Sequence, residues 1–369
     1  MKKTLTVTYQ DSDNYGSVLQ AYALQKVIED MGFENEIIDY RKPEVAEVYK
    51  IIKHIHNKHD FLSNIYNALN IKLLRLRKDR FELFRENNLK LTKRKYSTFN
   101  QLNENPPLAD CYVCGSDQVW NVGIVDFDET YLLQFVKEGR KLSYAASGIK
   151  EYTTTEQLLT IANQAKTFDA VSVRENIAKK RLKSITGIVV ERVLDPVLLL
   201  NKNEWGKLTY DYSDRAPYMM CYFVGGVSKD FEKYTNNIAK KLGLKRILIM
   251  SDWKNIFRSG EKRYDCGPIE FLSLIKYADL VCTNSFHGTA LSIIFNKPFQ
   301  VGMHVPFKED RITTLLKLCE LTEREIDPKN IKADESCLDI NYDKANQKLE
   351  IEKKRCLDWL NQAIEGEST

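Results

Sequence analysis

Short apolar segments typical of strands alternate with helical segments along almost the whole chain, and this alternation constrains the fold most. In the first half, strand-like segments occupy residues 5–9, 34–40, 112–114, 141–146, 170–173 and 189–194, with helical segments between most of them. Consecutive strands joined through helices require right-handed crossovers, which place the strands parallel in one sheet. The first half is therefore predicted to be an α/β domain with a doubly wound sheet.

The alternation breaks between Asp195-Pro196 and Arg215-Ala216-Pro217 and then restarts. Because 369 residues exceed one ordinary core, we expect two domains. The fold class predicted is α/β, with two Rossmann-like domains facing a cleft and ligands bound at the carboxyl ends of their strands. The expected boundaries are 1–205 for an N-terminal acceptor-side domain with a basic helical insertion at about 44–100, 206–340 for a C-terminal donor-side domain, and 341–369 for a helix that crosses back to the first domain.

Composition places the chain among globular proteins. No apolar run approaches the roughly 20 residues that span a bilayer, and the first nine residues alternate like a strand, unlike a signal peptide. We therefore expect a cytoplasmic protein, with peripheral contact at the inner face of the membrane as an added alternative. The eight cysteines are read as reduced, mostly buried thiols. Cys111 and Cys114 form a C-x-x-C, but it lies in a strand that enters a glycine turn, which argues against redox or metal chemistry.

Positive charge is concentrated in one window. Residues 72–95 hold ten Lys or Arg against three acidic residues, a net charge of +7, so the rest of the chain is net −3 within the total of +4. Leucines and phenylalanines at helical spacing predict an amphipathic basic helix there. A solvated helix face is the simplest interpretation, and attraction to anionic lipid or to a phosphorylated, lipid-linked acceptor is the next. No nucleic acid partner is expected, because no nucleic-acid-binding module accompanies the charge.

The segment 283–291 predicts an anion site. It joins a buried-type strand to a helix that opens on small residues, so the N–H groups of the first helical turn and the positive end of the helix dipole point toward one place. Hydroxyls of Ser285 and Thr289 lie in the same turn. His287 adds a side chain that exchanges protons near neutral pH. The simpler interpretation is an ordinary N-cap beside a structural histidine.

Four further polar clusters follow predicted strands, at 14–17, 115–121, 143–148 and 172–175. A shared rim at the carboxyl edge of a sheet is the economical explanation, although each cluster also fits a turn or a helix cap. The guanidinium fork of Arg174 suits a carboxylate or phosphate, and Asp117 suits a base or a ligand for sugar hydroxyls. Trp120 is interpreted either as a ring that stacks on a sugar or as a core tryptophan.

Five segments, in this order along the chain, resemble the polysaccharide pyruvyl transferase family, and the resemblance extends over most of the chain. They are Asn14-Tyr15-Gly16-Ser17, residues 115–121, residues 172–175, Asp195-Pro196 and residues 285–290. The resemblance implies a glycosyltransferase-B-like fold and transfer of pyruvate from phosphoenolpyruvate to a sugar hydroxyl pair, giving a ketal on a cell-surface polysaccharide or its precursor. It also implies catalytic roles for His287, Asp117 and Arg174. Donor binding falls to Arg174, Ser285, His287, Gly288 and Thr289, and acceptor binding to Asn14, Tyr15, Gly16, Ser116, Asp117, Gln118 and Trp120.

One position departs from the family. Members often carry an arginine two residues before the histidine, where this chain has Ser285, so Lys297 or Arg311 would have to supply the cation. No cofactor or metal is expected, with phosphoenolpyruvate as co-substrate and a lipid-linked or nucleotide-linked sugar as acceptor. Two alternatives stay open. One is a glycosyltransferase that uses a nucleotide sugar, for which Gly225-Gly226 and Glu270 are weak candidates, and the other is a non-catalytic glycan-binding relative.

Overall fold

The structure is a computed structural model that describes residues 2–125, 127–250, 256–302, 311–327, 329 and 334–366. The chain divides into two compact units, which are described one at a time. Unit 1 comprises Met1–Lys50, Arg85–Leu200 and Glu352–Thr369, and unit 2 comprises Ile51–Phe84 and Asn201–Ile351. Within the described residues, no helix has the length and apolar composition that crossing a bilayer requires.

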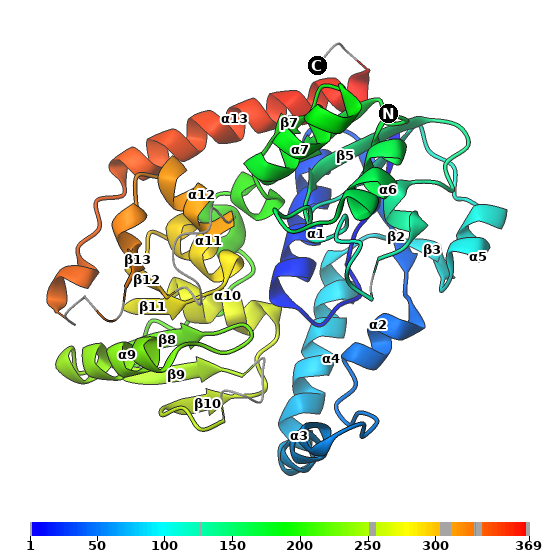
Figure 1. Cartoon of the computed structure of the whole chain (residues 1–369). Coiled ribbons are helices and arrows are strands. Elements are labelled where there is room, and N and C mark those ends of the chain that lie inside the picture. Colours follow the sequence, from blue (N-terminus) through cyan, green and yellow to red (C-terminus); the bar gives the residue numbers. More distant parts are fainter. Residues whose placement is uncertain are drawn as a thin grey trace. The chain divides into compact units, whose positions relative to one another are not determined.

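Unit 1 is built on a seven-stranded sheet (Figure 1). Its strands are β1 (Lys3–Val7), β2 (Glu34–Tyr40), β3 (Leu91–Tyr96), β4 (Cys111–Cys114), β5 (Arg140–Ala146), β6 (Ala170–Val173) and β7 (Glu191–Arg192). They lie in the order β3-β2-β1-β4-β5-β6-β7, and every pair is parallel. The strand order reverses between β1 and β4, so the loops at the carboxyl ends of these two strands flank the usual ligand position of such a sheet.

The helices of unit 1 cover a sheet in which the strands β4 and β6 are buried throughout. They are α1 (Tyr15–Asp30), α2 (Pro43–Val48), α5 (Phe99–Glu104), α6 (Thr155–Ala165) and α7 (Asn176–Thr186). All four residues of β4 are buried, as are all four of β6. Continuous burial is what a parallel strand covered on both faces requires, and it explains why these segments read as apolar runs without alternation.

Unit 2 is built on a second parallel sheet. Its strands are β8 (Tyr218–Tyr222), β9 (Lys245–Ile249), β10 (Glu261–Arg263), β11 (Leu280–Thr283), β12 (Phe299–Gly302) and β13 (Glu325–Ile326). The order is β10-β9-β8-β11-β12-β13, so the reversal falls between β8 and β11. The helices that belong wholly to this unit include α3 (Lys58–Leu69), α8 (Lys202–Gly206), α9 (Lys229–Lys241), α10 (Pro268–Lys276), α11 (Phe286–Ile294) and α12 (Arg311–Leu318).

Two helices contribute residues to both units. In α4 (Ile71–Asn88) the change falls between Phe84 and Arg85, and in α13 (Asp343–Glu365) it falls between Ile351 and Glu352. The unit 1 part of α13 packs by its own contacts: the Leu194 N–H donates to Cys356 Sγ at 3.2 Å, and the Trp359 ring lies 6.3 Å from that of Tyr144.

The expected basic insertion at 44–100 differs from the structure in two ways. The helix predicted over 72–95 ends at Asn88, and the last basic residues lie in or beside β3, which pairs with β2 as the edge strand of the sheet. Exposed Lys and Arg suit an edge strand because they discourage pairing with another chain. The stretch 51–84 also groups with unit 2, partly because Arg80 pairs with Asp265 at 2.8 Å.

The cysteines give a first prediction. All eight are free and buried, and burial raises the pKa of Cys111 to about 12 and that of Cys114 still higher. Only the thiolate attacks a disulfide reagent, so we expect the thiols of the native protein not to react with Ellman's reagent at pH 8. In the unfolded protein, all eight thiols should react. Rapid reaction of two thiols in the native protein would contradict this and would restore the C-x-x-C as a redox motif.

Candidate functional site

The loop after β4 brings Asp117 to the carboxyl edge of the unit 1 sheet, beside the first turn of α1. The Ser17 hydroxyl donates a hydrogen bond to Asp117 Oδ2, and the Ser147 N–H donates to the Asp117 carbonyl at 3.0 Å. Asp117 has φ of 70°, a left-handed conformation that is uncommon for a residue other than glycine. The two hydrogen bonds hold this conformation, so the carboxylate has a fixed position.

Arg174 follows β6 and lies at the centre of a buried network. Its Nη1 pairs with Asp195 Oδ2, its Nη2 donates to Ser147 Oγ at 2.8 Å, and its Nε lies 3.3 Å from Glu175 Oε1. Burial works against the charge, but the carboxylates of Asp195, Glu175 and Asp117 outweigh it and raise the pKa of Arg174. The expected fork for a donor anion is therefore occupied by the protein's own groups, and Arg174 ties together the loops that carry Asp117.

Asp195 was not among the predicted site residues. It is 1% exposed, accepts a hydrogen bond from Ser116 Oγ at 3.1 Å, and caps the turn that starts at Pro196 by accepting from the Val197 N–H at 3.0 Å. Ser116, a predicted acceptor residue, is therefore connected to the Arg174 network by its hydrogen bond to Asp195. The sequence signal for this role was the Asp-Pro pair directly after a strand.

The remaining predicted acceptor residues divide by exposure. Asn14 is exposed and caps α1 by accepting from the Gly16 N–H at 2.9 Å, while Tyr15 and Gly16 themselves are buried. Gln118 is half-buried, and its Oε1 accepts from Asn121 Nδ2 at 2.8 Å. Among the predicted acceptor residues, the polar side chains that reach solvent are therefore those of Asn14 and Gln118.

The structure corrects the expectation that Trp120 stacks on a sugar. The ring is 1% exposed, its Nε1–H donates to the Tyr131 carbonyl at 3.1 Å, and its edge meets Phe168 with ring centroids 6.0 Å apart. A buried ring whose polar atom already has a hydrogen-bond partner has no surface to offer a ligand, so Trp120 is a core residue.

In unit 2, the segment 283–289 forms the predicted strand-to-helix turn. Ser285 is the N-cap of α11, and its Oγ accepts from the Gly288 N–H at 3.4 Å. A Cβ on Gly288 would lie 2.7 Å from Thr283 Oγ1, so glycine lets the helix approach β11. The Thr289 hydroxyl donates to the Ser285 carbonyl at 3.0 Å. These residues build the turn and orient the positive end of the α11 dipole.

Asn284 is a further residue that the sequence reasoning missed. Its Oδ1 accepts from the Val224 N–H at 2.8 Å, and its Nδ2 donates to the carbonyls of Val224 and Gly226 at 3.0 and 2.8 Å. Asn284 therefore joins the loops after β8 and β11 at the point where the strand order reverses. A single asparagine after a strand carries no sequence signal for such a link.

The two candidate cations differ in position. Lys297 follows the end of α11 and precedes β12, whereas the predicted site is at the start of α11, about 13 Å away along nine residues. Lys297 is therefore at the amino edge of the sheet, and the expectation that it supplies the missing cation is wrong. Arg311 begins α12, and its guanidinium carbon lies 5.9 Å from the ring centroid of Phe286, the first residue of α11.

His287 occupies the second position of α11. Its side chain is buried, with its ring edge-on to that of Phe286 at a centroid distance of 5.2 Å. Phe286 thus contacts both His287 and Arg311, which brings a proton-exchanging group and a cation to one helix start within unit 2.

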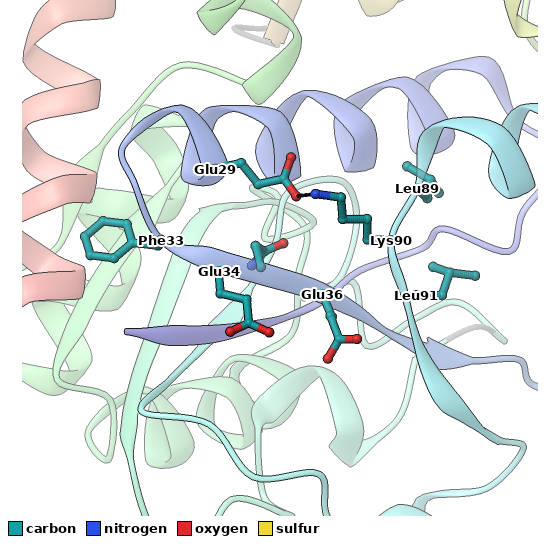
Figure 2. Close-up of a pocket in the computed structure, with 8 residues that line it drawn as sticks. Glu29, Phe33, Glu34, Glu36, Leu89, Lys90 and Leu91 are labelled. Carbon is teal, nitrogen blue, oxygen red and sulfur yellow. Dashed lines mark ion pairs between the residues drawn. The ribbon is translucent and has the colours of Figure 1, made fainter. Parts of the chain in front are cut away.

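A distinct hollow of about 780 Å³ lies elsewhere in unit 1 (Figure 2). It is lined at the amino end of β2 by Glu29, Phe33, Glu34, Asn35, Glu36, Leu89, Lys90 and Leu91. Lys90 pairs with Glu29 at 2.7 Å and Lys3 pairs with Glu36 at 3.0 Å, so the cations beside the three lining carboxylates are already engaged by them. A hollow at the amino edge that has three carboxylates and no uncommitted lysine in its lining does not suit an anionic ligand. Among the described residues, no group of three or more His, Cys, Asp or Glu side chains is placed to hold a metal ion.

Solved structures confirm the fold class. A putative UDP-N-acetylglucosamine 2-epimerase from Listeria monocytogenes is 11% identical, with 99% of this chain and 97% of that chain covered and a TM-score of 0.55. The UDP-GlcNAc 2-epimerase of Methanocaldococcus jannaschii is 12% identical, with 98% and 99% covered and a TM-score of 0.50. These likenesses show two Rossmann-like α/β domains of the glycosyltransferase-B type.

Sequence comparison identifies the family to which the chain belongs. No curated protein matches the chain. The model of the polysaccharide pyruvyl transferase family, by contrast, matches residues 14–300, well over half of the chain, from the cap of α1 to β12. The matched region includes Asp117, Arg174 and His287, and it confirms the resemblance drawn from the strand-end motifs. The chain belongs to the polysaccharide pyruvyl transferase family.

Proposed function

We propose that this chain transfers pyruvate from phosphoenolpyruvate to a hydroxyl pair of a sugar, forming a ketal on a cell-surface polysaccharide or its precursor. The observation that carries the proposal is the start of α11, where a capped helix N-terminus, His287 and Arg311 lie together at the strand-order reversal of unit 2. Membership of the family supports the same reaction.

Phosphoenolpyruvate carries a carboxylate and a phosphate, and the α11 turn offers matching groups. Helix N-termini bind phosphate and carboxylate groups through backbone N–H donors and the helix dipole. An arginine adds a cation with a planar fork that fits either anion. In this proposal Arg311 takes the place of the arginine that the family often carries at the position of Ser285.

The proposed reaction needs one acid and one base. A sugar hydroxyl loses its proton to a base and its oxygen bonds to C2 of phosphoenolpyruvate, while the methylene carbon C3 takes a proton from an acid and becomes a methyl group. The oxygen of the second hydroxyl then bonds to C2, and the bond between C2 and the phosphate oxygen breaks. The proton of the second hydroxyl leaves with inorganic phosphate or goes to a nearby base. His287 is proposed as the acid or as a ligand of the phosphate.

On the acceptor side we propose Asp117 as the base. Its carboxylate already accepts a hydrogen bond from the Ser17 hydroxyl, the same contact that a sugar hydroxyl would make before losing its proton. Exposed Asn14 and half-buried Gln118 are proposed to contact the sugar. Arg174 acts as a positioning residue, because its fork is occupied by Asp195, Ser147 and Glu175.

The alternative of a nucleotide-sugar glycosyltransferase loses one of its two candidate contacts. Glu270 is buried, accepts from the Gly267 N–H at 2.9 Å and pairs with Arg80 Nε at 3.1 Å, so it caps α10 and offers no carboxylate to a ribose. The solved relatives named above are described as UDP-N-acetylglucosamine 2-epimerases, which keeps UDP-sugars as the comparison ligands of choice.

The donor site can be tested with two matched single variants. We expect Arg311→Ala to weaken phosphoenolpyruvate binding about 10- to 100-fold, since a charged hydrogen bond contributes roughly 1.5–3 kcal/mol. Lys297→Ala, which removes a cation at the other edge of the same sheet, should bind as the wild type does. Calorimetric titration of both variants measures this. Loss of binding in Lys297→Ala with none in Arg311→Ala would contradict the placement of the donor.

A further inference from the structure

Helix α3 presents its apolar residues to solvent. Phe61, Leu62, Ile65 and Leu69 are 45 to 81% exposed. At 3.6 residues per turn these four side chains fall within an arc of about 100° on one face of the helix, which we call the α3 stripe. A helix on the surface of a globular protein normally turns such a stripe inward.

The inward face of α3 carries two asparagines and a tyrosine instead. Asn64 is buried, and its side chain accepts from the Lys53 N–H at 2.9 Å and donates to the Lys53 carbonyl at 2.7 Å. Asn67 Nδ2 donates to the Ile51 carbonyl at 2.7 Å, and Tyr66 packs against Tyr264 with centroids 5.8 Å apart. Specific contacts therefore hold α3 in this orientation, and they keep the apolar stripe facing outward.

Helix α4 follows α3 directly in the chain (Figure 1) and is exposed in the same way. Its Leu73, Leu76 and Leu83 are exposed, and Lys72, Arg75 and Lys78, which are also exposed, lie between or beside them in the sequence. Across the described residues, nineteen large hydrophobic side chains are exposed, and nine of them fall within 51–84. Scattered exposed apolar residues need no explanation, but this concentration marks an interaction surface.

The charge of this surface decides its partner. Residues 51–84 contain seven Lys or Arg (53, 58, 72, 75, 77, 78 and 80) and three acidic residues (60, 79 and 82), a net charge of +4. Arg80 pairs with Asp265 and Glu270, so the other residues of this stretch carry a net charge of +3. A second copy of the chain would bring two such charges together, which is unfavourable. An anionic bilayer surface complements both properties, because it attracts the cations and accepts the apolar stripe.

We propose that α3 and α4 form a membrane-docking surface, with α3 lying in the plane of an anionic bilayer, its apolar stripe among the upper acyl chains and the cations of α4 at the headgroups. The occupant is the lipid surface itself. The inference does not depend on the reaction proposed above, because docking is measured without phosphoenolpyruvate or a sugar acceptor.

Co-sedimentation with phosphatidylcholine vesicles containing phosphatidylglycerol tests the stripe. We expect the full-length protein to bind, and Leu62→Gln/Ile65→Gln/Leu69→Gln to bind about 1,000-fold more weakly, because burying each of the three aliphatic side chains is worth roughly tenfold. The control Leu108→Gln/Leu159→Gln/Val189→Gln removes three exposed apolar side chains of unit 1 and should bind like the wild type. Equal binding by all three proteins would overturn the proposal.

A second pair of variants tests the charge. Lys72→Gln/Arg75→Gln/Lys78→Gln should weaken binding by about fivefold per cation, and raising the salt concentration should reduce the difference. Lys166→Gln/Lys180→Gln/Lys183→Gln removes three exposed lysines of unit 1 and should have little effect. If the control loses binding as strongly as the α4 variant, the contact is unspecific and the proposal fails.

Insertion of the stripe can be seen directly. The native cysteines are all buried, so a cysteine introduced by Leu69→Cys takes up an environment-sensitive NBD label selectively. We expect its emission to shift to the blue with phosphatidylglycerol vesicles and to stay unchanged with pure phosphatidylcholine vesicles at physiological salt. If the emission stays unchanged while vesicles are bound, the stripe does not insert and the proposal fails. If the protein self-associates without lipid in sedimentation equilibrium, and the stripe variant abolishes this, the surface binds a second copy of the chain instead.

Discussion

Replacing His287 with alanine is expected to lower turnover by about 10²- to 10⁴-fold while the protein stays folded. The residue lies at the start of α11 beside Phe286, and in the proposed reaction it donates the proton that converts the methylene carbon to a methyl group or binds the leaving phosphate. The measurement is phosphate release from phosphoenolpyruvate with UDP-linked and lipid-linked sugars offered as acceptors.

Two controls separate catalysis from folding for this variant. His54→Ala removes an exposed histidine of unit 2 and should leave turnover unchanged. The thermal unfolding midpoint of His287→Ala should lie within a few degrees of the wild type. A variant that unfolds at room temperature, or one that keeps full activity, would make His287 a structural residue of the turn.

Replacing Arg174 with alanine is expected to act mainly on stability. It would leave the Asp195 carboxylate, which is 1% exposed, without its cation, and breaking a buried pair in this way costs roughly 3–5 kcal/mol. Urea unfolding measures the difference. Lys26→Ala, which breaks a pair with Asp30 on the surface of α1, should cost less than about 1 kcal/mol.

A double variant distinguishes positioning from donor binding by Arg174. Arg174→Met/Asp195→Asn removes both charges but keeps an oxygen that can accept from Ser116 Oγ or the Val197 N–H, so it should recover much of the stability, because no buried charge is left unpaired. Phosphoenolpyruvate binding in this double variant should stay near that of the wild type. If the double variant recovers stability but binds phosphoenolpyruvate more than about tenfold more weakly than the wild type, Arg174 has the donor-binding role that the family resemblance implies.

The sequence predicted those features that depend on neighbours along the chain. The alternation of strands and helices follows from local patterning, and so does the turn at 283–289, where a strand, an N-cap and a helix are consecutive. The resemblance across 14–300 rested on the same strand-end segments and was confirmed by the family comparison.

Features that depend on distant partners could not be predicted in the same way. Whether Trp120 faces solvent or core depends on Phe168 and Tyr131, and whether Arg174 is available depends on Asp195. Lys297 stands close to the α11 turn in sequence, yet a nine-residue helix carries it to the other edge of the sheet. In these cases the residue type was compatible with the expected role, and the tertiary contact decided otherwise.

The basic window illustrates the same limit for secondary structure. Its helical spacing predicted α4 correctly as far as Asn88, but the pairing of Leu91 with Ile37 then converts the remaining basic residues to an edge strand. Charge alone did not show which residues would face outward. The exposed apolar stripe of α3 became visible only when Asn64 and Asn67 were seen to face inward.

Calorimetric titration of the wild-type protein with phosphoenolpyruvate, compared with UDP-N-acetylglucosamine, pyruvate and inorganic phosphate, tests the proposed donor most directly. We expect saturable binding of phosphoenolpyruvate that is tighter than that of pyruvate or phosphate alone, because in the proposed site the α11 turn and Arg311 engage both anionic groups of one molecule. Clear binding of the UDP-sugar beside a silent phosphoenolpyruvate titration would contradict the proposal and assign the chain to nucleotide-sugar chemistry.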